Sequence, residues 1–230
     1  MFNLIERRFK RLPIPPEHVV LTFDDGPVPG QTDRLLDLLG AAGVPAGFCL
    51  VGQRIEGQEA LVRRMTANGH TIINHSFTHR TPQKLPDAEI LSELDRFDAQ
   101  VQGALGDAAW RSRFYRPPSG LWEQRLAELV HGSGRSLMPM TYFAWDPFWM
   151  PQRIPLLLFG LKWTLKENRG GLLMLHEALV PLKGESDPAP ARNQREWLLE
   201  LVDKLMLTVQ DLGMRFVSPE VMDGWDRDNG

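Results

Sequence analysis

The chain has 230 residues, of which 43% are hydrophobic and 24% charged, a composition typical of a globular protein with one large domain. Its formal net charge of -3 comes without a basic stripe, which argues against a nucleic-acid-binding protein. The single cysteine, Cys49, excludes an internal disulfide and a zinc site made of cysteines.

Strand-like and helix-like patterns alternate along the chain. Short apolar runs predict strands at 19–23, 46–51, 71–74, 114–115, 140–145, 171–175 and 214–217. Apolar residues at helical spacing predict helices at 32–42, 59–68, 86–105, 122–131 and 192–212. This alternation predicts an α/β domain with a parallel sheet. Cys49 lies within an apolar run and is expected to be a buried core thiol, and His18, His70 and His131 are interpreted as structural or exposed.

Two adjacent carboxylates, Asp24 and Asp25, end the first predicted strand and are followed by Gly26-Pro27. Because side chains alternate along a strand, Asp24 and Asp25 are expected to point in different directions. One carboxylate can then hold a metal while the other handles protons. The alternative is a tight turn with an aspartate cap.

His75 and His79 follow the third predicted strand, four residues apart. On a helical turn, this spacing places both imidazoles on one face. Asp25 completes a set of two histidines and one carboxylate, which leaves a coordination position open and is typical of catalytic zinc; cobalt, nickel or iron fits the same ligands. The alternative is a pair of surface or core histidines.

Four further polar residues favour hydrolytic chemistry. Asp24 can take a proton from an attacking water, and Arg116 can orient Asp24 and keep it ionised. His176 follows an apolar strand. It can be a core residue, a fourth metal ligand or a general acid, and Asp146 can hydrogen-bond it. All these groups follow predicted strands, and active sites of (β/α) barrels are built at that edge.

The segment 149–168 breaks the alternation, because it is rich in Trp, Pro, Leu and Phe. It is interpreted as a packed helical insertion, with a lid, a partner surface or a membrane-contacting surface as alternatives. No stretch reaches the length needed to span a membrane, and the best candidate, 154–165, is short and contains Lys162. Residues 1–8 contain no apolar core of signal-peptide length, so a cytoplasmic location is expected, or an extracytoplasmic one if a leader was removed.

Together the motifs resemble those of the polysaccharide deacetylases of carbohydrate esterase family four. The matching stretches are Thr22-Phe23-Asp24-Asp25-Gly26-Pro27, His75-Ser76-Phe77-Thr78-His79, Arg116-Pro117-Pro118, Trp145-Asp146 and Leu173-Met174-Leu175-His176. The resemblance covers about residues 18–217. It implies a distorted (β/α) barrel of about seven parallel strands in a single domain, and metal-dependent removal of acetyl groups from N-acetylated amino sugars.

The resemblance also implies roles for individual residues. Asp24 would be the base, Arg116 its orienting partner and His176 the acid. Asp25, His75 and His79 would bind the metal. The substrate would contact Pro118, Ser119, Trp145 and Met174. The family usually has an aromatic residue at position 119 and a second aspartate in its fourth motif, so this chain departs from the pattern at both places.

The sequence therefore predicts an N-terminal extension at 1–17, a catalytic domain at 18–217 with the apolar insertion 149–168, and a tail at 218–230. We expect a metal-dependent deacetylase acting on an N-acetylated carbohydrate, most simply with zinc. One alternative is a deformylase or amidohydrolase acting on another C–N bond, such as that of a lipid-linked sugar. Another is a catalytically inactive carbohydrate-binding domain. The glycan and the oligomeric state stay open.

Overall fold

The computed structural model describes residues 12–120, 123–139, 142–143, 153–178 and 196–223. Its strands are β1 His18–Gly26, β2 Gly47–Leu50, β3 Thr71–Asn74, β4 Phe114–Tyr115, β5 Ser136–Leu137, β6 Tyr142–Phe143, β7 Gly170–His176 and β8 Arg215–Phe216. Its α-helices are α2 Gln31–Ala42, α3 Glu59–Ala67, α4 Asp87–Leu105, α5 Gln124–Gly132, α6 Ile154–Asn168 and α8 Glu196–Asp211. Short 3₁₀ turns include η1 Gly52–Arg54, η3 Pro118–Gly120 and η6 Pro219–Met222.

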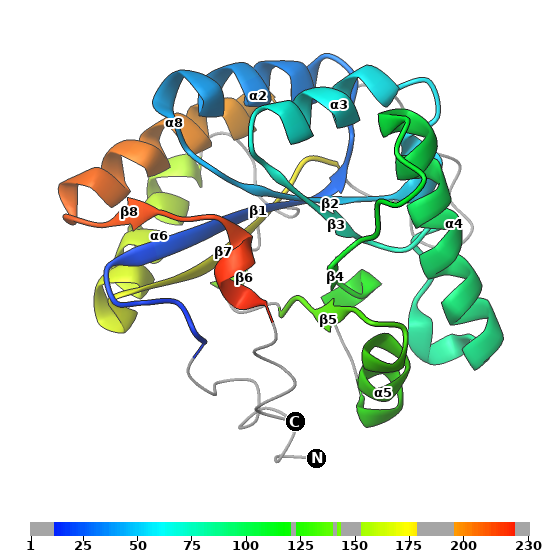
Figure 1. Ribbon diagram of the computed structural model, residues 1–230. Coiled ribbons are helices and arrows are strands. Elements are labelled where there is room, and N and C mark those ends of the chain that lie inside the picture. Colours follow the sequence, from blue (N-terminus) through cyan, green and yellow to red (C-terminus); the bar gives the residue numbers. More distant parts are fainter. Residues whose placement is uncertain (1–11, 121–122, 140–141, 144–152, 179–195, 224–230) are drawn as a thin grey trace.

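The strands form one parallel sheet in the order β5-β4-β3-β2-β1-β7-β6, with β8 beside the start of β1. Figure 1 shows this sheet curled, with helices along its outer face. Each outer helix packs on its neighbour in the series α6, α8, α2, α3 and α4. The predicted α/β domain with a distorted (β/α) barrel of parallel strands is confirmed. The described pairings leave β5 and β6 at opposite ends of the strand path, so this part of the barrel is open.

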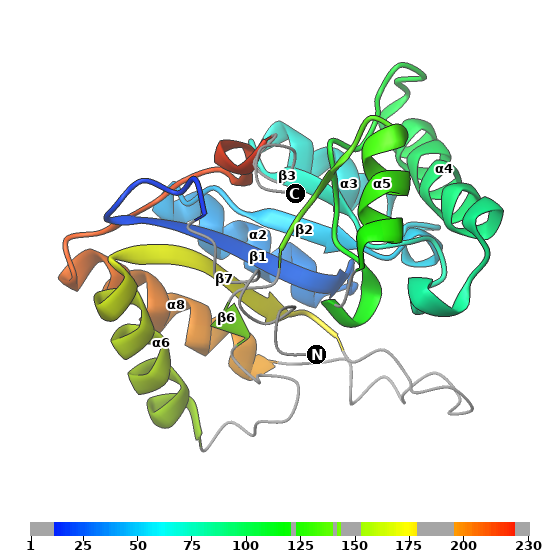
Figure 2. The ribbon, with the colours of Figure 1, turned by 90° about the horizontal axis from the view of Figure 1, so that it is seen from below.

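Side-chain alternation divides the sheet into an outer and an inner face. Along β1, Val19, Leu21 and Phe23 belong to the large cluster under the outer helices, whereas Val20 belongs to a smaller inner cluster. Figure 2 shows β1 and β7 running side by side through the molecule. Their register aligns Asp24 with His176, so both residues stand at the same carboxyl-terminal edge.

Most predicted elements agree with the structure to within a few residues. The sequence missed β5, because a strand of two residues is too short to show alternation. Cys49 is fully buried in the inner cluster, as predicted, and burial raises the pKa of its thiol. Packing also continues past the predicted boundary at residue 217, since Pro219 and Met222 of η6 are buried.

The insertion predicted at 149–168 contains helix α6, and residues 149–152 lie outside the described part of the chain. Four apolar side chains, one from each turn or so of α6, are buried against the core: Ile154, Leu157, Leu161 and Leu165. The prediction of a packed helix is therefore confirmed for 154–168. Among the described residues, no helix is both long enough and apolar enough to cross a membrane.

Candidate active site

Three of the predicted catalytic residues reach the inner side of the carboxyl-terminal edge. Asp24 follows Val20 and Thr22 in the inward-facing alternation of β1, and it lies beside His176 of β7. Arg116 directly follows β4 and is fully buried. Its Nη1 donates to Asp24 Oδ1 at 2.5 Å and to Thr22 Oγ1 at 2.8 Å. Alternation along β1 and the position of Arg116 after β4 therefore bring the predicted base into contact with the predicted orienting cation.

The Asp24 carboxylate is held in its ionised form by its surroundings. Burial raises the pKa of Asp24. The Arg116 guanidinium lowers that pKa, and His75 and His176 lower it further, so the net pKa lies below its ordinary value of 3.8. An ionised carboxylate is the form that accepts a proton.

Asp25 departs from strand alternation. The pairing of β1 with β2 shifts register between Asp24 and Gly26, and Asp25 has a φ of 69°. Its Oδ1 lies 3.4 Å from His75 Nε2, and Asp24 Oδ2 lies 4.0 Å from the same nitrogen. The prediction that the two carboxylates point in different directions is wrong, because the irregularity at the strand end turns both toward one imidazole.

His75 and His79 lie on either side of a bend at 77–78, so this bend, and not a helical turn, brings the two imidazoles together. Ser76 and His79 both have positive φ, 70° and 57°, and this tight path brings the imidazole centroids to 4.9 Å. His79 Nε2 lies 3.2 Å from Asp25 Oδ1. Each of the three residues thus contributes one potential ligand atom, and these atoms lie within 4.8 Å of one another.

The chemistry of these three groups fits a divalent metal. Asp25 Oδ1 is buried and has no hydrogen-bond partner in the described part of the chain. His75 Nδ1 lies 2.7 Å from the carbonyl oxygen of Arg116, to which it donates, so in the neutral ring Nε2 carries the lone pair that a metal would take. Burial raises the pKa of Asp25, but His75 and His79 lower it well below its ordinary value. Two neutral imidazole nitrogens and one carboxylate are ligands that zinc and similar metals take.

Glu93 of α4 holds the bend that carries the two histidines. Its Oε2 accepts hydrogen bonds from Ser76 Oγ at 2.5 Å, Phe77 N at 3.1 Å, and Thr78 N and Oγ1 at 2.7 and 2.8 Å. Burial raises the pKa of Glu93, and these donors lower it to a net value below the ordinary one. One buried carboxylate therefore fixes the backbone between the two histidines.

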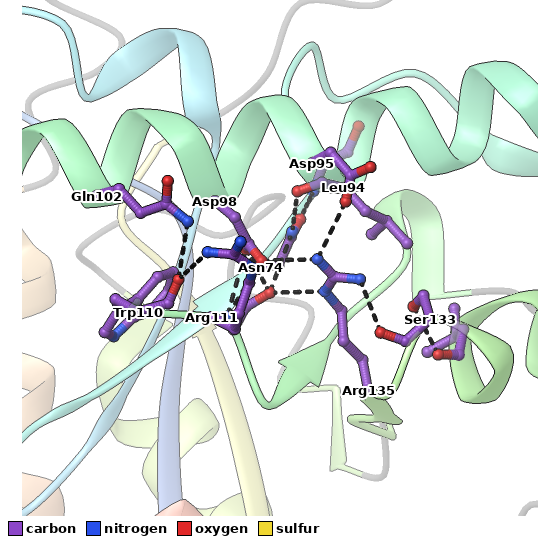
Figure 3. Close-up of polar contacts among 12 residues, drawn as sticks. Asn74, Leu94, Asp95, Asp98, Gln102, Trp110, Arg111, Ser133 and Arg135 are labelled. Carbon is purple, nitrogen blue, oxygen red and sulfur yellow. Dashed lines mark hydrogen bonds and ion pairs between the residues drawn. The ribbon is translucent and has the colours of Figure 1, made fainter. Parts of the chain in front are cut away.

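Asn74 fixes the start of the same bend. Its Oδ1 accepts from Ser76 N at 2.9 Å, and its Nδ2 donates to Leu94 O at 3.2 Å and approaches Ser112 Oγ at 3.5 Å. Figure 3 shows Asn74 beside the buried ion pair of Asp98 and Arg135, whose atoms lie 2.6 Å apart. Buried groups that are fully hydrogen-bonded in this way fix local geometry.

Two glycines allow the backbone to approach the site closely. A Cβ at Gly52 would meet the Phe77 ring and lie 3.0 Å from Phe77 Cα, and Gly52 N donates to Ser76 O at 3.0 Å. A Cβ at Gly26 would collide with Glu177 Oε1. A side chain at Gly52 would displace the segment between the two histidines, and one at Gly26 would displace the buried Glu177 carboxylate.

Glu177 lies fully buried behind the strand end. Its carboxylate contacts the Thr32 hydroxyl, and its own backbone N donates to Asp24 O at 2.8 Å. Oε1 has no hydrogen-bond partner within the described ranges. Burial raises the pKa of Glu177 to about 8, although the Thr32 hydrogen bond and Arg54 oppose that rise. Glu177 is therefore protonated near neutral pH.

The remaining predicted site residues are placed only in part. Met174 is buried on the inward side of β7, and Pro118 is buried in η3 next to an exposed Ser119 with a φ of 67°. Asp146 and Trp145 lie outside the described residues. The hypothesis that Asp146 contacts His176 therefore stays a prediction.

Sequence reasoning missed two residues of the site, Glu93 and Glu177. Glu93 is three residues after Ile90 and four before Phe97, so the helical periodicity already placed it on the buried face of α4. An acidic residue at such a position is a signal of a buried hydrogen-bonding role. Glu177 follows a predicted strand. The last residue of that strand cannot be located exactly from the sequence, so the pattern did not show that Glu177 is buried.

Comparison with known proteins agrees with this geometry. The family model described as polysaccharide deacetylase matches residues 12–136. The chain is 28% identical over 196 residues to a chitooligosaccharide deacetylase of Bradyrhizobium sp. (strain ANU 289), covering 85% of each chain. It is 30% identical over 184 residues to a chitooligosaccharide deacetylase of Sinorhizobium fredii (strain NBRC 101917 / NGR234), covering 76% of this chain and 79% of that one. The fold is similar to that of a chitin deacetylase from the fungal pathogen Colletotrichum lindemuthianum, with a TM-score of 0.75, 21% identity, and 94% and 93% of the two chains covered.

Proposed function

The chain belongs to the polysaccharide deacetylase family, and we propose that it hydrolyses the N-acetyl amide of an amino-sugar oligosaccharide such as a chitooligosaccharide. The observation that carries the proposal is the joint placement of a set of three groups and a pair. Asp25 converges with the two histidines, and the ionised Asp24 lies next to them with its guanidinium partner. Support for the sugar substrate comes from the names of the relatives.

We assign the metal to Asp25, His75 and His79, and zinc is the proposed ion because the ligands are two imidazoles and one carboxylate. When bound, such a metal polarises a carbonyl oxygen and makes a water molecule more acidic. The three side chains supply one negative charge, which leaves the centre cationic.

Asp24 is the proposed general base. Its Oδ2 lies 4.0 Å from His75 Nε2, so a water molecule near the metal ligands is within its reach. One nitrogen of Arg116 donates to Asp24 Oδ1 and another to Pro139 O at 3.2 Å. These two hydrogen bonds fix the position of the guanidinium and of the carboxylate. The guanidinium therefore orients the base and leaves Oδ2 to accept a proton.

His176 is the proposed general acid. The β1–β7 register sets it beside Asp24 at the same edge, on the strand that also carries Met174. Amide hydrolysis must protonate a leaving amine, and an imidazolium is suited to that near neutral pH. Met174 is the proposed wall of a small acyl pocket, since its side chain is buried on the inward face of β7.

The first test is an acetate-release assay on chitooligosaccharides with added Zn²⁺ or Co²⁺, using Asp24→Asn. The amide cannot accept the proton, so kcat should fall by about 10²–10⁴ while the metal still binds. Asp37→Asn is the matched control, because that carboxylate is exposed on α2, and it should retain activity. A rate in the Asp24→Asn variant equal to that of the control would refute the assignment of the base.

The same assay separates the alternative functions. Release of formate from an N-formylated substrate without release of acetate would indicate a deformylase. Binding of both metal and oligosaccharide without release of either acid would indicate a carbohydrate-binding domain. We expect acetate release, since the groups needed for each proton transfer are present.

A further inference from the structure

Helix α6 is apolar on both of its faces. Its inner face packs on the core, and its outer face exposes Leu156, Phe159 and Trp163 to 58%, 69% and 62%. Residues separated by three and four positions lie on one side of a helix, so these three side chains form a continuous stripe. In the described part of the chain, only one other large hydrophobic side chain, Leu207 of α8, is exposed to this degree.

Such a stripe is costly in water. Burying a side chain of this size contributes about 1.5–3 kcal/mol, and an outward helix face normally carries polar residues instead. Single exposed hydrophobic residues are ordinary, but several gathered on one face mark a surface that meets another apolar phase. We therefore expect the outer face of α6 to be covered by another molecule.

The positive charges around the stripe indicate the chemistry of the molecule that covers it. Lys162 and Lys166 are exposed and one turn apart, and Lys162 is three residues from Phe159. Arg153 precedes the helix, whereas Arg169 at its end pairs with Glu17 at 2.7 Å, and Glu167 is the one acidic residue of α6, although the chain as a whole has a net charge of -3. Cationic character is thus concentrated where the apolar side chains are exposed.

The size of the stripe argues against a second copy of the chain. Three side chains of this size expose on the order of 400 Å² together. A stable dimer buries about 800 Å² on each partner. A bilayer requires no such area, because aromatic side chains enter the headgroup region singly while lysines contact anionic lipids.

We propose that the outer face of α6 docks on the surface of an anionic phospholipid bilayer. Leu156, Phe159 and Trp163 enter the boundary between headgroups and acyl chains, and Lys162 and Lys166 contact the phosphates. The helix lies in the plane of the interface, since at 15 residues it is too short to cross the hydrocarbon layer. This inference does not depend on the proposed reaction.

The test is co-sedimentation of the full chain with vesicles of phosphatidylcholine, with and without phosphatidylglycerol, at low salt. The wild-type protein should sediment with the vesicles that contain phosphatidylglycerol. The double variant F159S/W163S should bind at least about tenfold more weakly, because two aromatic anchors are lost. K162E/K166E should lose the preference for phosphatidylglycerol. L207S, which removes the exposed leucine of α8, should bind like the wild-type protein.

Three results would overturn the proposal. The wild-type protein could stay in the supernatant with both vesicle types. F159S/W163S could bind as well as the L207S control, which would place the contact elsewhere. Gel filtration could show a dimer that the same two substitutions dissolve, which would make a second copy the occupant. Far-UV circular dichroism and a Tm like those of the wild-type protein show that each variant is folded, and this control does not require the proposed activity.

Discussion

The contact of Asp24 with Arg116 shows that a buried arginine can contribute more to the proposed reaction than to the stability of the fold. Taking two charges out of water is expensive, and a buried ion pair often adds nothing to stability compared with apolar residues of the same size. Arg116 nevertheless lies fully buried, with one nitrogen 2.5 Å from Asp24 Oδ1. Its benefit is an ionised carboxylate facing the metal ligands, which an apolar residue could not provide.

Glu177 gives a pH-dependent prediction at the same scale. Its pKa is raised from 4.5 to about 8 by burial, so between these values the folded protein binds a proton that the unfolded chain releases. The wild-type protein therefore loses stability as pH rises from about 4.5 to 8. Glu177→Gln stays neutral and removes this loss, so relative to wild type it should gain on the order of a few kcal/mol across that range.

Urea unfolding at several pH values, with chelator present, measures this gain. Glu59→Gln is the control, because backbone hydrogen bonds, among them that from Gly57 N, hold the pKa of this carboxyl at the start of α3 below its ordinary value, so it is ionised in both the folded and the unfolded chain across this range. If the stability difference between Glu177→Gln and wild type stayed constant from pH 5 to pH 8, Glu177 would be ionised in the folded protein.

Single residues also show which features of the site could be predicted from the sequence. The direction of Asp24 was predictable from alternation along β1, and the role of Arg116 from its charge and its place directly after a predicted strand. The orientation of Asp25 was not, since it depends on a register shift in pairing with another strand. The positive φ values of Ser76 and His79 were equally hidden, because neither is a residue type that favours this conformation as glycine does.

At the scale of elements, the site depends on one bend supported by one helix. Non-glycine residues with positive φ cost about 1–3 kcal/mol each, so the bend needs support from its surroundings. Glu93 supplies that support through four hydrogen bonds to three consecutive residues, and η1 adds two more from Gly52 N and Gln53 N. The positions of His75 and His79 are therefore set by α4 and η1.

Glu93→Ala should weaken metal binding without removing a ligand. With its acceptor gone, the bend relaxes, and we expect Zn²⁺ or Co²⁺ affinity to fall about 10–100-fold, as for other residues that support metal ligands. Glu93→Gln keeps one acceptor oxygen, so its metal affinity should lie between those of the wild-type protein and Glu93→Ala. The measurement is a competition titration against a chelator, with the absorption spectrum of bound Co²⁺ as a second readout.

Glu89→Ala is the matched control for Glu93. Glu89 lies one turn away on the same helix and pairs with Arg80 at 2.9 Å, but its side chain is half exposed. It should bind metal like the wild-type protein. Equal affinities in Glu93→Ala and Glu89→Ala would show that Glu93 only stabilises the fold.

At the scale of the whole molecule, the core and the site occupy different places. The large cluster lies between the sheet and its outer helices, whereas the proposed metal ligands lie at the carboxyl-terminal edge of the strands. The alternation of strands and helices was enough to predict this arrangement, because it follows from parallel pairing alone. The exposed stripe of α6 was not predictable, because an apolar run does not reveal which of its faces is covered.

Removal of the metal should therefore leave the fold intact. After dialysis against a chelator, we expect far-UV and near-UV circular dichroism close to that of the metal-loaded protein, with acetate release abolished. Adding Zn²⁺ back should restore activity and raise the Tm, by an amount equivalent to about 2.7 kcal/mol at a free concentration of 100 times Kd. His79→Ala should show no such rise, and loss of near-UV signal on chelation would contradict the prediction.

The most direct test of the central claim is anomalous diffraction from a crystal soaked in Zn²⁺. We predict one peak within about 2.0–2.2 Å of a carboxylate oxygen of Asp25 and of Nε2 of both His75 and His79, with Asp24 outside bonding distance. A peak bound to any other set of residues, or one that lacks any of these three ligands, would contradict the account.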